Sequence, residues 1–256
     1  MSWKPTSLSA ILLITSVSVF GCGEDFVFRL PDPAVRYVAF GDAATKGPSS
    51  RDYIESLVDL LGESAETYSN EGEGGETTED GVERLRSLVA SNLFPNAEAM
   101  FFWEGGNDLT DFLQETDPLL IFSPAAPVYP FSDSLDAKLD EIQANVEAAI
   151  RTGHDAGWNV YVATYFFLPA GSTDCNPLLL DILLPTQALV ANAYVTLLNE
   201  RIRLAAAREG AILVDVASKD GELRGDSDNY FDCNHLSASG NAIVAALFLE
   251  VIQNQP

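Results

Sequence analysis

Short apolar runs alternate along the chain with longer stretches in which apolar residues recur every three or four positions. An uninterrupted apolar run bounded by turn residues predicts a buried strand, and the spaced pattern predicts an amphipathic helix. The predicted strands are residues 37–40, 99–103, 160–166 and 212–216. The predicted helices are residues 53–61, 135–153, 186–209 and 238–252.

Strands that alternate with helices imply right-handed crossovers and parallel neighbours. We therefore expect an α/β fold, a three-layer α/β/α sandwich around a mostly parallel sheet of about five strands. Ligands of such sheets bind beyond the carboxyl ends of the strands, so the residues that directly follow the strands are the candidates for chemistry. Two long loops, 111–134 and 169–185, predict a substrate wall or lid, or else a cover for the sheet edge.

The N-terminal segment has the pattern of an export signal. Lys4 supplies a positive start, and residues 8–20 form an apolar run too short to span a membrane comfortably. The run leads to Gly21-Cys22, which resembles the lipobox of bacterial lipoproteins, in which the cysteine is acylated. We expect 1–22 to be a signal peptide, 23–35 a tether and 36–256 one domain. The protein would then be exported and lipid-anchored in the cell envelope; the alternative is an ordinary signal that leaves it secreted and free.

The chain has three cysteines, Cys22, Cys175 and Cys233. If Cys22 carries lipid, an even pair remains, and an exported domain lies in an oxidising compartment. The sequence therefore predicts a disulfide between Cys175 and Cys233, with two free, buried thiols as the alternative. The spacing of the cysteines does not indicate a metal site.

The charge balance is strongly acidic, with 14 Lys+Arg against 38 Asp+Glu and a formal net charge of −24. Such a surface repels phosphate backbones and anionic lipids, so nucleic acid is not expected as a partner. A membrane is expected only through the lipid anchor. A solvated, self-repelling surface explains the charge, and the alternatives are preference for a neutral or cationic substrate and adaptation to high salt.

Four short segments combine small turn residues with side chains capable of catalysis. They are Gly41-Asp42-Ala43-Ala44-Thr45, Asn70 through Gly75-Glu76-Thr77, Gly105-Gly106-Asn107-Asp108, and Asp232-Cys233-Asn234-His235. In this order and spacing they resemble the SGNH hydrolase family, also called GDSL-like lipases and esterases. The resemblance covers about residues 36–256 and implies a flavodoxin-like arrangement of the sheet.

The resemblance also implies roles for single residues. His235 matches the catalytic base, and Asp232 matches the carboxylate that orients its imidazole. The oxyanion of the tetrahedral intermediate would be held by the backbone N–H groups of Ala43 and Gly75 and by the side chain of Asn107. Gly72 and Gly74 are alternatives to Gly75. Members of this family use neither a metal nor a cofactor.

The nucleophile position departs from the family pattern, because Ala43 stands where the family has serine. A methyl group has no lone pair with which to attack a carbonyl carbon. Loss of a triad serine typically lowers turnover by about 10⁶. Thr45, Ser49 and Ser50 are the nearby hydroxyls, and Thr45 is expected to face the helix that follows.

The sequence leaves three functions open. The first is an ester hydrolase of the cell envelope, inactive or strongly impaired through Ala43, whose substrate would be a small acyl ester, a lipid or an acetylated glycan. The second is a pseudoenzyme that binds such ligands without cleaving them, either natural or with its serine replaced. The third is a structural envelope lipoprotein, which would have no compact site: His235 would lie far from Asp232, and Asn107 far from Ala43.

Overall fold

The computed structural model describes residues 29–47, 51–171 and 183–255. The strands are β1 (Tyr37–Gly41), β2 (Tyr68–Gly72), β3 (Ala99–Trp103), β4 (Asn159–Ala163) and β5 (Ile212–Val214). The α-helices are α1 (Ala43–Lys46), α2 (Tyr53–Leu61), α3 (Thr78–Ala90), α4 (Gly106–Thr116), α5 (Ser132–Asp155), α6 (Pro185–Glu209), α7 (Asp220–Leu223) and α8 (Ala238–Gln253). Short 3₁₀ turns occupy Ala65–Thr67, Val216–Lys219 and Ser227–Asn229.

The five strands form one parallel sheet in the order β2-β1-β3-β4-β5. The chain moves from β1 to β2 on one side and then crosses back to place β3 on the other side of β1. This reversal opens a crevice at the carboxyl ends of β1 and β3, where parallel sheets bind their ligands. Gly41 pairs with Trp103 at these two ends, so the residues that follow both strands emerge side by side.

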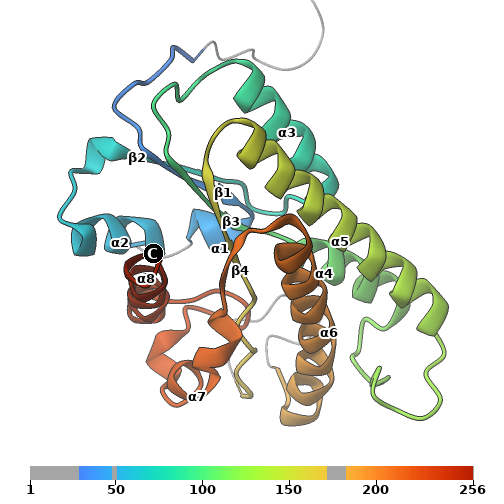
Figure 1. Ribbon diagram of the computed structural model, residues 1–256. Helices are drawn as coiled ribbons and strands as arrows, with labels where there is room; N and C mark the ends of the chain where they lie inside the picture. Colours follow the sequence, from blue (N-terminus) through green and yellow to red (C-terminus); the bar gives the residue numbers. More distant parts are fainter. Residues whose placement is uncertain (1–28, 48–50, 172–182, 256) are drawn as a thin grey trace, which may run out of the picture.

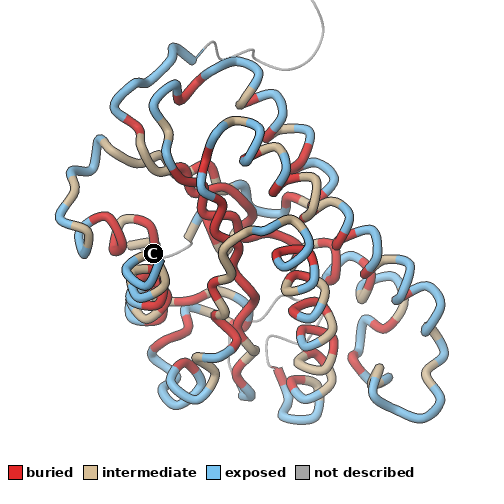
Figure 2. Tube along the Cα trace, in the orientation of Figure 1, coloured by how far each residue is buried: buried red, intermediate tan, exposed pale blue. Residues whose placement is uncertain are grey.

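Helices cover both faces of the sheet, which gives the expected α/β/α sandwich (Figure 1). On one face α2 packs against α8, and on the other α5 packs against α3, α4 and α6. The buried residues follow the central strands and the inward sides of these helices (Figure 2). All five residues of β3 are buried, as expected for a strand covered on both faces.

The elements differ from the sequence predictions where local pattern is weak. Strand β2 has the sequence Tyr-Ser-Asn-Glu-Gly and was not predicted, because an edge strand of mixed polarity has no apolar run. Helices α3 and α4 were also missed. Helix α4 takes in the start of the loop predicted at 111–134. The strand predicted at 160–166 ends at Ala163, and the residues beyond it enter the functional site.

The loop after α4 covers α6 and does not form a lid over the crevice. The Asp117 carboxylate accepts hydrogen bonds from the backbone N–H groups of Ile121 and Phe122. The Tyr194 hydroxyl on α6 then donates to the Phe122 carbonyl oxygen at 2.8 Å. The part of the predicted loop that became α4 contributes Leu113 to the cavity wall, and the rest packs on α6 instead of on the sheet edge.

Several sequence predictions concern residues outside the described ranges. These are the signal peptide 1–22 with Cys22, the first part of the tether (23–28), Ser49, Ser50 and Cys175. Cys233 is described and is buried, with 5% of its surface exposed. Its pairing with Cys175 stays a prediction. Within the described ranges, no helix combines the length and the apolar character needed to cross a membrane.

Candidate active site

Ala43 begins helix α1 on a tight turn after β1. Gly41 has φ +148°, and a Cβ there would lie 1.9 Å from the Trp103 carbonyl oxygen, so only glycine fits. Asp42 caps the helix: its Oδ1 accepts a hydrogen bond from the Ala44 N–H at 2.8 Å. As the first helical residue, Ala43 has an N–H group without a partner inside the helix, and this group is suited to bind an anion.

Asn107 follows β3 in the first turn of α4. Its Nδ2 donates a hydrogen bond to the backbone carbonyl oxygen of Glu76 at 2.8 Å. An amide nitrogen has two hydrogens, so the second remains for a ligand. The adjacent Asp108 is buried and accepts hydrogen bonds from the N–H and hydroxyl of Thr78, which ties α4 to the start of α3.

Asp232 and His235 lie on one loop before α8 and contact each other. The Nδ1 atom of His235 lies 2.7 Å from Asp232 Oδ2 and 2.9 Å from Oδ1. Burial raises the pKa of Asp232, but hydrogen bonds from His235 and from the Asn234 N–H outweigh it and leave the pKa below its usual value. Asp232 therefore stays ionised and fixes the ring, with Nε2 left for proton transfer.

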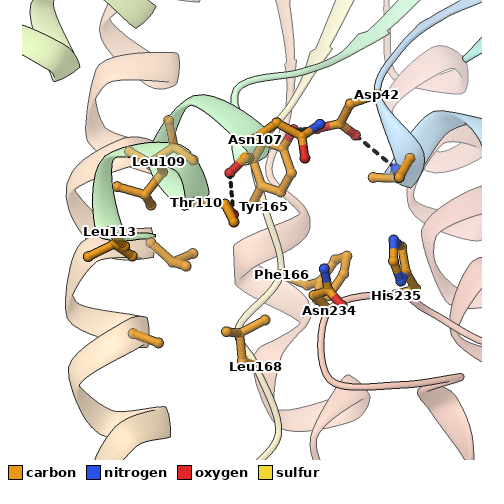
Figure 3. A pocket seen from close by; sticks show the side chains of 16 residues that line it. Asp42, Asn107, Leu109, Thr110, Leu113, Tyr165, Phe166, Leu168, Asn234 and His235 are labelled. Carbon is orange, nitrogen blue, oxygen red and sulfur yellow. Dashed lines mark hydrogen bonds between the residues drawn. The ribbon is translucent and has the colours of Figure 1, made fainter. Parts of the chain in front are cut away.

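These groups surround one cavity of about 120 Å³ (Figure 3). Ala43, Asn107 and His235 all line it. Its apolar wall comes from α4, α6 and the segment after β4; the residues are Leu109, Leu113, Phe166, Leu168, Ala191, Val195 and Leu198. A small apolar pocket with polar groups at one end fits a neutral ligand that carries one polar reacting centre.

A second pair of residues in the site was not anticipated from the sequence. The Tyr165 hydroxyl donates a hydrogen bond to Asp42 Oδ2 at 2.5 Å, and both side chains are buried. Tyr165 is itself held by Asn199 of α6, which bonds its backbone N–H at 2.7 Å and its carbonyl at 2.8 Å. The sequence analysis placed Tyr165 inside the predicted strand 160–166, whereas β4 ends at Ala163 and leaves Tyr165 in the segment that follows the strand. Burial raises the pKa of Asp42 to about 6, although the Tyr165 hydrogen bond lowers it.

The raised pKa of Asp42 predicts a pH-dependent stability. The folded protein binds this proton more tightly than the unfolded chain, so stability falls as the pH rises from about 4 to about 6. The loss is on the order of 3 kcal/mol. Asp42→Asn keeps an acceptor for the Ala44 N–H but does not titrate, and we expect it to remove this loss. Urea unfolding across that pH window measures the effect, with exposed Asp111→Asn as the control. Equal pH slopes for the parent and Asp42→Asn would contradict the prediction.

The other residues predicted to take part in the site, three glycines and Thr45, differ in how far they are buried. Gly75 is in the exposed turn between β2 and α3 with φ +86°, outside the cavity lining, and its role stays a prediction. Gly74 is also exposed, while Gly72 packs against the backbone of α1. Thr45 is fully buried, with its hydroxyl near the carbonyl oxygens of Phe40 and Trp103. Its hydroxyl therefore faces the ends of β1 and β3, and Thr45 is not among the residues that line the cavity.

The compact arrangement argues against the structural-lipoprotein hypothesis, which required His235 to lie far from Asp232 and Asn107 far from Ala43. A family model described as the GDSL-like lipase/acylhydrolase family matches residues 39–243 of this sequence. The chain belongs to this family. No curated protein matches the sequence significantly.

Solved structures of GDSL-like proteins share the fold at low sequence identity. A lipolytic protein of the G-D-S-L family from Veillonella parvula is 17% identical with a TM-score of 0.55, over 86% of this chain and 100% of that one. A catalytic mutant of an acetylxylan esterase from Geobacillus stearothermophilus is 16% identical with a TM-score of 0.57, over 89% and 98%. A lipase/acylhydrolase from Enterococcus faecalis is 19% identical with a TM-score of 0.54, over 86% and 95%.

The two histidines of this GDSL-like protein both lie in the described part of the chain. No group of three or more His, Cys, Asp or Glu side chains that could hold a metal ion occurs in the part of the chain that the structure describes. His154, the other histidine, is exposed in the last turn of α5, where a cation is favourable to the helix dipole. His235 is the histidine that reaches the cavity.

Proposed function

We propose that this chain carries an ester-hydrolase site of the GDSL type. The site would bind a neutral acyl ester but lacks the hydroxyl of the nucleophile. The observation that carries the proposal is that Ala43, Asn107 and His235 line one cavity, with Asp232 bonded to the far side of the imidazole. The proposal assigns the base to His235, the orienting carboxylate to Asp232, and oxyanion donation to the N–H of residue 43 and the amide of Asn107.

A serine hydroxyl at position 43 would complete the reaction path. The hydroxyl oxygen would attack the ester carbonyl carbon while Nε2 of His235 takes its proton. The carbonyl oxygen would become an oxyanion held by the N–H of residue 43 and the free amide hydrogen of Asn107. Asp232 would stabilise the imidazolium, which then protonates the leaving alcohol.

With Ala43 the bound ester meets no serine hydroxyl at the nucleophile position. Thr45 cannot substitute, because it is buried on the other side of α1, and Ser49 and Ser50 lie outside the described residues. The chain as written is therefore proposed to bind esters and to cleave them little or not at all.

Hydrolysis of p-nitrophenyl acetate and butyrate by the chain as written and by Ala43→Ser tests this proposal. Turnover by the serine variant alone supports it. If neither form turns over, the site is not that of an ester hydrolase. Fast turnover by the alanine form would overturn the assignment of the nucleophile position.

The second candidate function is ligand binding without hydrolysis, and the observation that favours it is the retained His235–Asp232 pair beside an alanine. The two candidates differ in what the alanine form does with an ester. A pseudoenzyme should bind a short-chain ester measurably by calorimetry and release it intact. An impaired hydrolase with no binding role of its own needs only weak affinity.

The proposed substrate is a neutral acyl ester, either small, on a lipid or on an acetylated glycan. The apolar cavity wall supports an acyl group, and the net charge of −24 disfavours an anionic substrate. Two of the structural neighbours are described as acetylxylan esterases, which supports a glycan ester as one choice for this chain.

We further propose that the protein is exported and anchored by lipid on Cys22, with Cys175 and Cys233 as a disulfide. Expressed with its signal in a bacterium, the chain should incorporate labelled palmitate and partition with the membranes. Cys22→Ser should lose the label, because no thiol remains to be acylated. Cys233→Ser is the control and should keep the label. An unlabelled parent chain would contradict the anchor and favour a freely secreted protein.

A further inference from the structure

Glu104 is a buried carboxyl group that the proposed chemistry does not use. It stands between β3 and the Gly105-Gly106-Asn107 segment, and only 1% of its surface is exposed. As a carboxylate it has no donor: among the described residues, none donates a hydrogen bond to either of its oxygens. An ionised carboxylate without hydrogen-bond donors is costly inside a protein. The burial of Glu104 therefore indicates that its carboxyl group is not ionised or has another partner.

Helix α3 confines this carboxyl group. A Cβ at Gly81 would lie 2.2 Å from Oε2 and 2.4 Å from Oε1 of Glu104, so the carboxyl packs directly on the bare helix backbone. The glycine therefore leaves just the room that Glu104 occupies. The side chain is held toward the start of α3 and away from solvent.

The neighbouring acid is Glu76, in the turn before α3. Its carboxylate is bound by Arg84 through two hydrogen bonds of 2.5 Å. Arg84 also lies over the Phe40 ring, 3.9 Å from its centre, and donates to the Glu71 carbonyl oxygen. The guanidinium is thus held in place by Glu76 and its surroundings, and it neutralises one of the two acids.

Two neighbouring carboxyl groups share one arginine, and a proton held between Glu104 and Glu76 would remove the remaining negative charge. Burial raises the pKa of Glu104 far above its usual value, and the adjacent Glu76 raises it further. Asp42 also opposes the ionisation of Glu104, and Arg84 favours it. Tyr165 is another titratable neighbour, because burial raises the pKa of its hydroxyl and Glu104 is among the charges that raise it further. A protonated Glu104 would donate to the Glu76 carboxylate, which is its hydrogen-bonding neighbour, and its own oxygen would then have a partner.

Glu76 connects this proton to the oxyanion donors, because its backbone carbonyl oxygen accepts the hydrogen bond from Asn107 Nδ2 at 2.8 Å. We propose that Glu104 is a positioning residue: through a proton shared with Glu76 it fixes the turn on which the Asn107 amide is oriented toward the cavity. The inference rests on the proposed function for the role of Asn107. The role of Glu104 in holding that amide can be measured without turnover.

Kinetics in the Ala43→Ser background form the first test. Glu104→Leu removes the shared proton and should lower kcat about 10- to 100-fold with KM changed less than about 3-fold, because an oxyanion contact acts mainly in the transition state. Glu104→Gln keeps a donor toward Glu76 and should restore most of the lost kcat. Glu79→Gln, an exposed change on the same helix, is the matched control and should leave both constants unchanged.

The pH profile of kcat separates positioning from simple stability. As the pH rises, Glu104 loses its proton, the two carboxylates repel each other, and kcat should fall on the alkaline limb. Glu104→Gln cannot titrate and should shift or remove that limb. Equal limbs in the two proteins, or equal kcat for the Gln and Leu variants, would overturn the proposal. If Glu104→Leu does not fold, the comparison of the alkaline limb of kcat between the parent and Glu104→Gln is the test.

A readout without catalysis keeps this inference distinct from the proposed function. In the chain as written, the side-chain amide signals of Asn107 in ¹⁵N NMR should move and exchange faster with solvent in Glu104→Leu, and return toward the parent in Glu104→Gln. Unmoved signals would refute the positioning role even if the Ala43→Ser variant is active. Moved signals with an inactive serine variant would support the positioning and reject the hydrolase.

Discussion

Replacing Ala43 with serine is expected to raise kcat for p-nitrophenyl ester hydrolysis by about 10⁴- to 10⁶-fold over the chain as written. The upper figure is the cost of removing a triad serine from an optimised protease. The reason is geometric: Ala43 and His235 line the same cavity, and the imidazole is already oriented by Asp232 at 2.7 Å. A hydroxyl there would be added to a cavity that His235 and Asn107 already line.

Ala44→Ser is the matched control, because Ala44 lines the same cavity one residue later on α1. It adds the same hydroxyl to the same short helix, at a position that no oxyanion donor or base is arranged to serve. Steady-state kinetics on both purified variants and on the parent give the comparison. Equal gains from the two substitutions would mean that the cavity merely tolerates a hydroxyl and that position 43 has no special role.

Removing His235 from the Ala43→Ser variant is expected to return turnover to the level of the chain as written. The serine and its base act as one unit, so either loss costs about 10⁶ in kcat, and the two losses together cost little more. Asp232→Asn in the same background should cost about 10⁴, because the imidazole then takes the wrong tautomer. In the parent chain, His235→Ala should change nothing, since Ala43 has no proton to give.

His154→Ala is the control for this experiment, because it removes the other histidine from an exposed site on α5. It should leave the kinetics of the serine variant intact. Should His235→Ala keep most of the activity, another group must serve as base, and the assignment of the Asp232–His235 pair would fall. Circular dichroism of each variant separates loss of chemistry from loss of fold.

The sequence predicted correctly those elements that depend on interactions between residues close together in the chain. The buried runs at 37–40 and 99–103 became β1 and β3, and the expected α/β/α sandwich is the observed fold. The predicted end of the long helix at Gly210 holds, since this residue has φ +72° in a left-handed cap. Asp232 and His235, three residues apart, could meet on one loop without help from the rest of the chain.

Other parts depended on partners far away in sequence. Strand β2 forms by pairing with the edge of β1. Its own residues do not show a clear pattern of apolar and polar positions that would predict a strand. The hydrogen bond between Tyr165 and Asp42 joins residues that are 123 positions apart. The Glu104–Glu76–Arg84 group likewise comes from the end of β3, a turn and α3. No repeating pattern of apolar residues in the sequence predicts any of these contacts.

The sequence by itself determined the alternation of strands and helices, the absence of a hydroxyl at position 43, and the short-range pair of acid and base. These follow from side-chain period and from residue identity, which neighbours in the chain carry by themselves. The tertiary structure alone decided which residues share the cavity, that Gly75 lies outside it, and which carboxyl groups are buried. Burial and long-range pairing set the proton affinity of Asp42 and Glu104, and both arise only when the sheet brings β1, β3 and the start of α3 together.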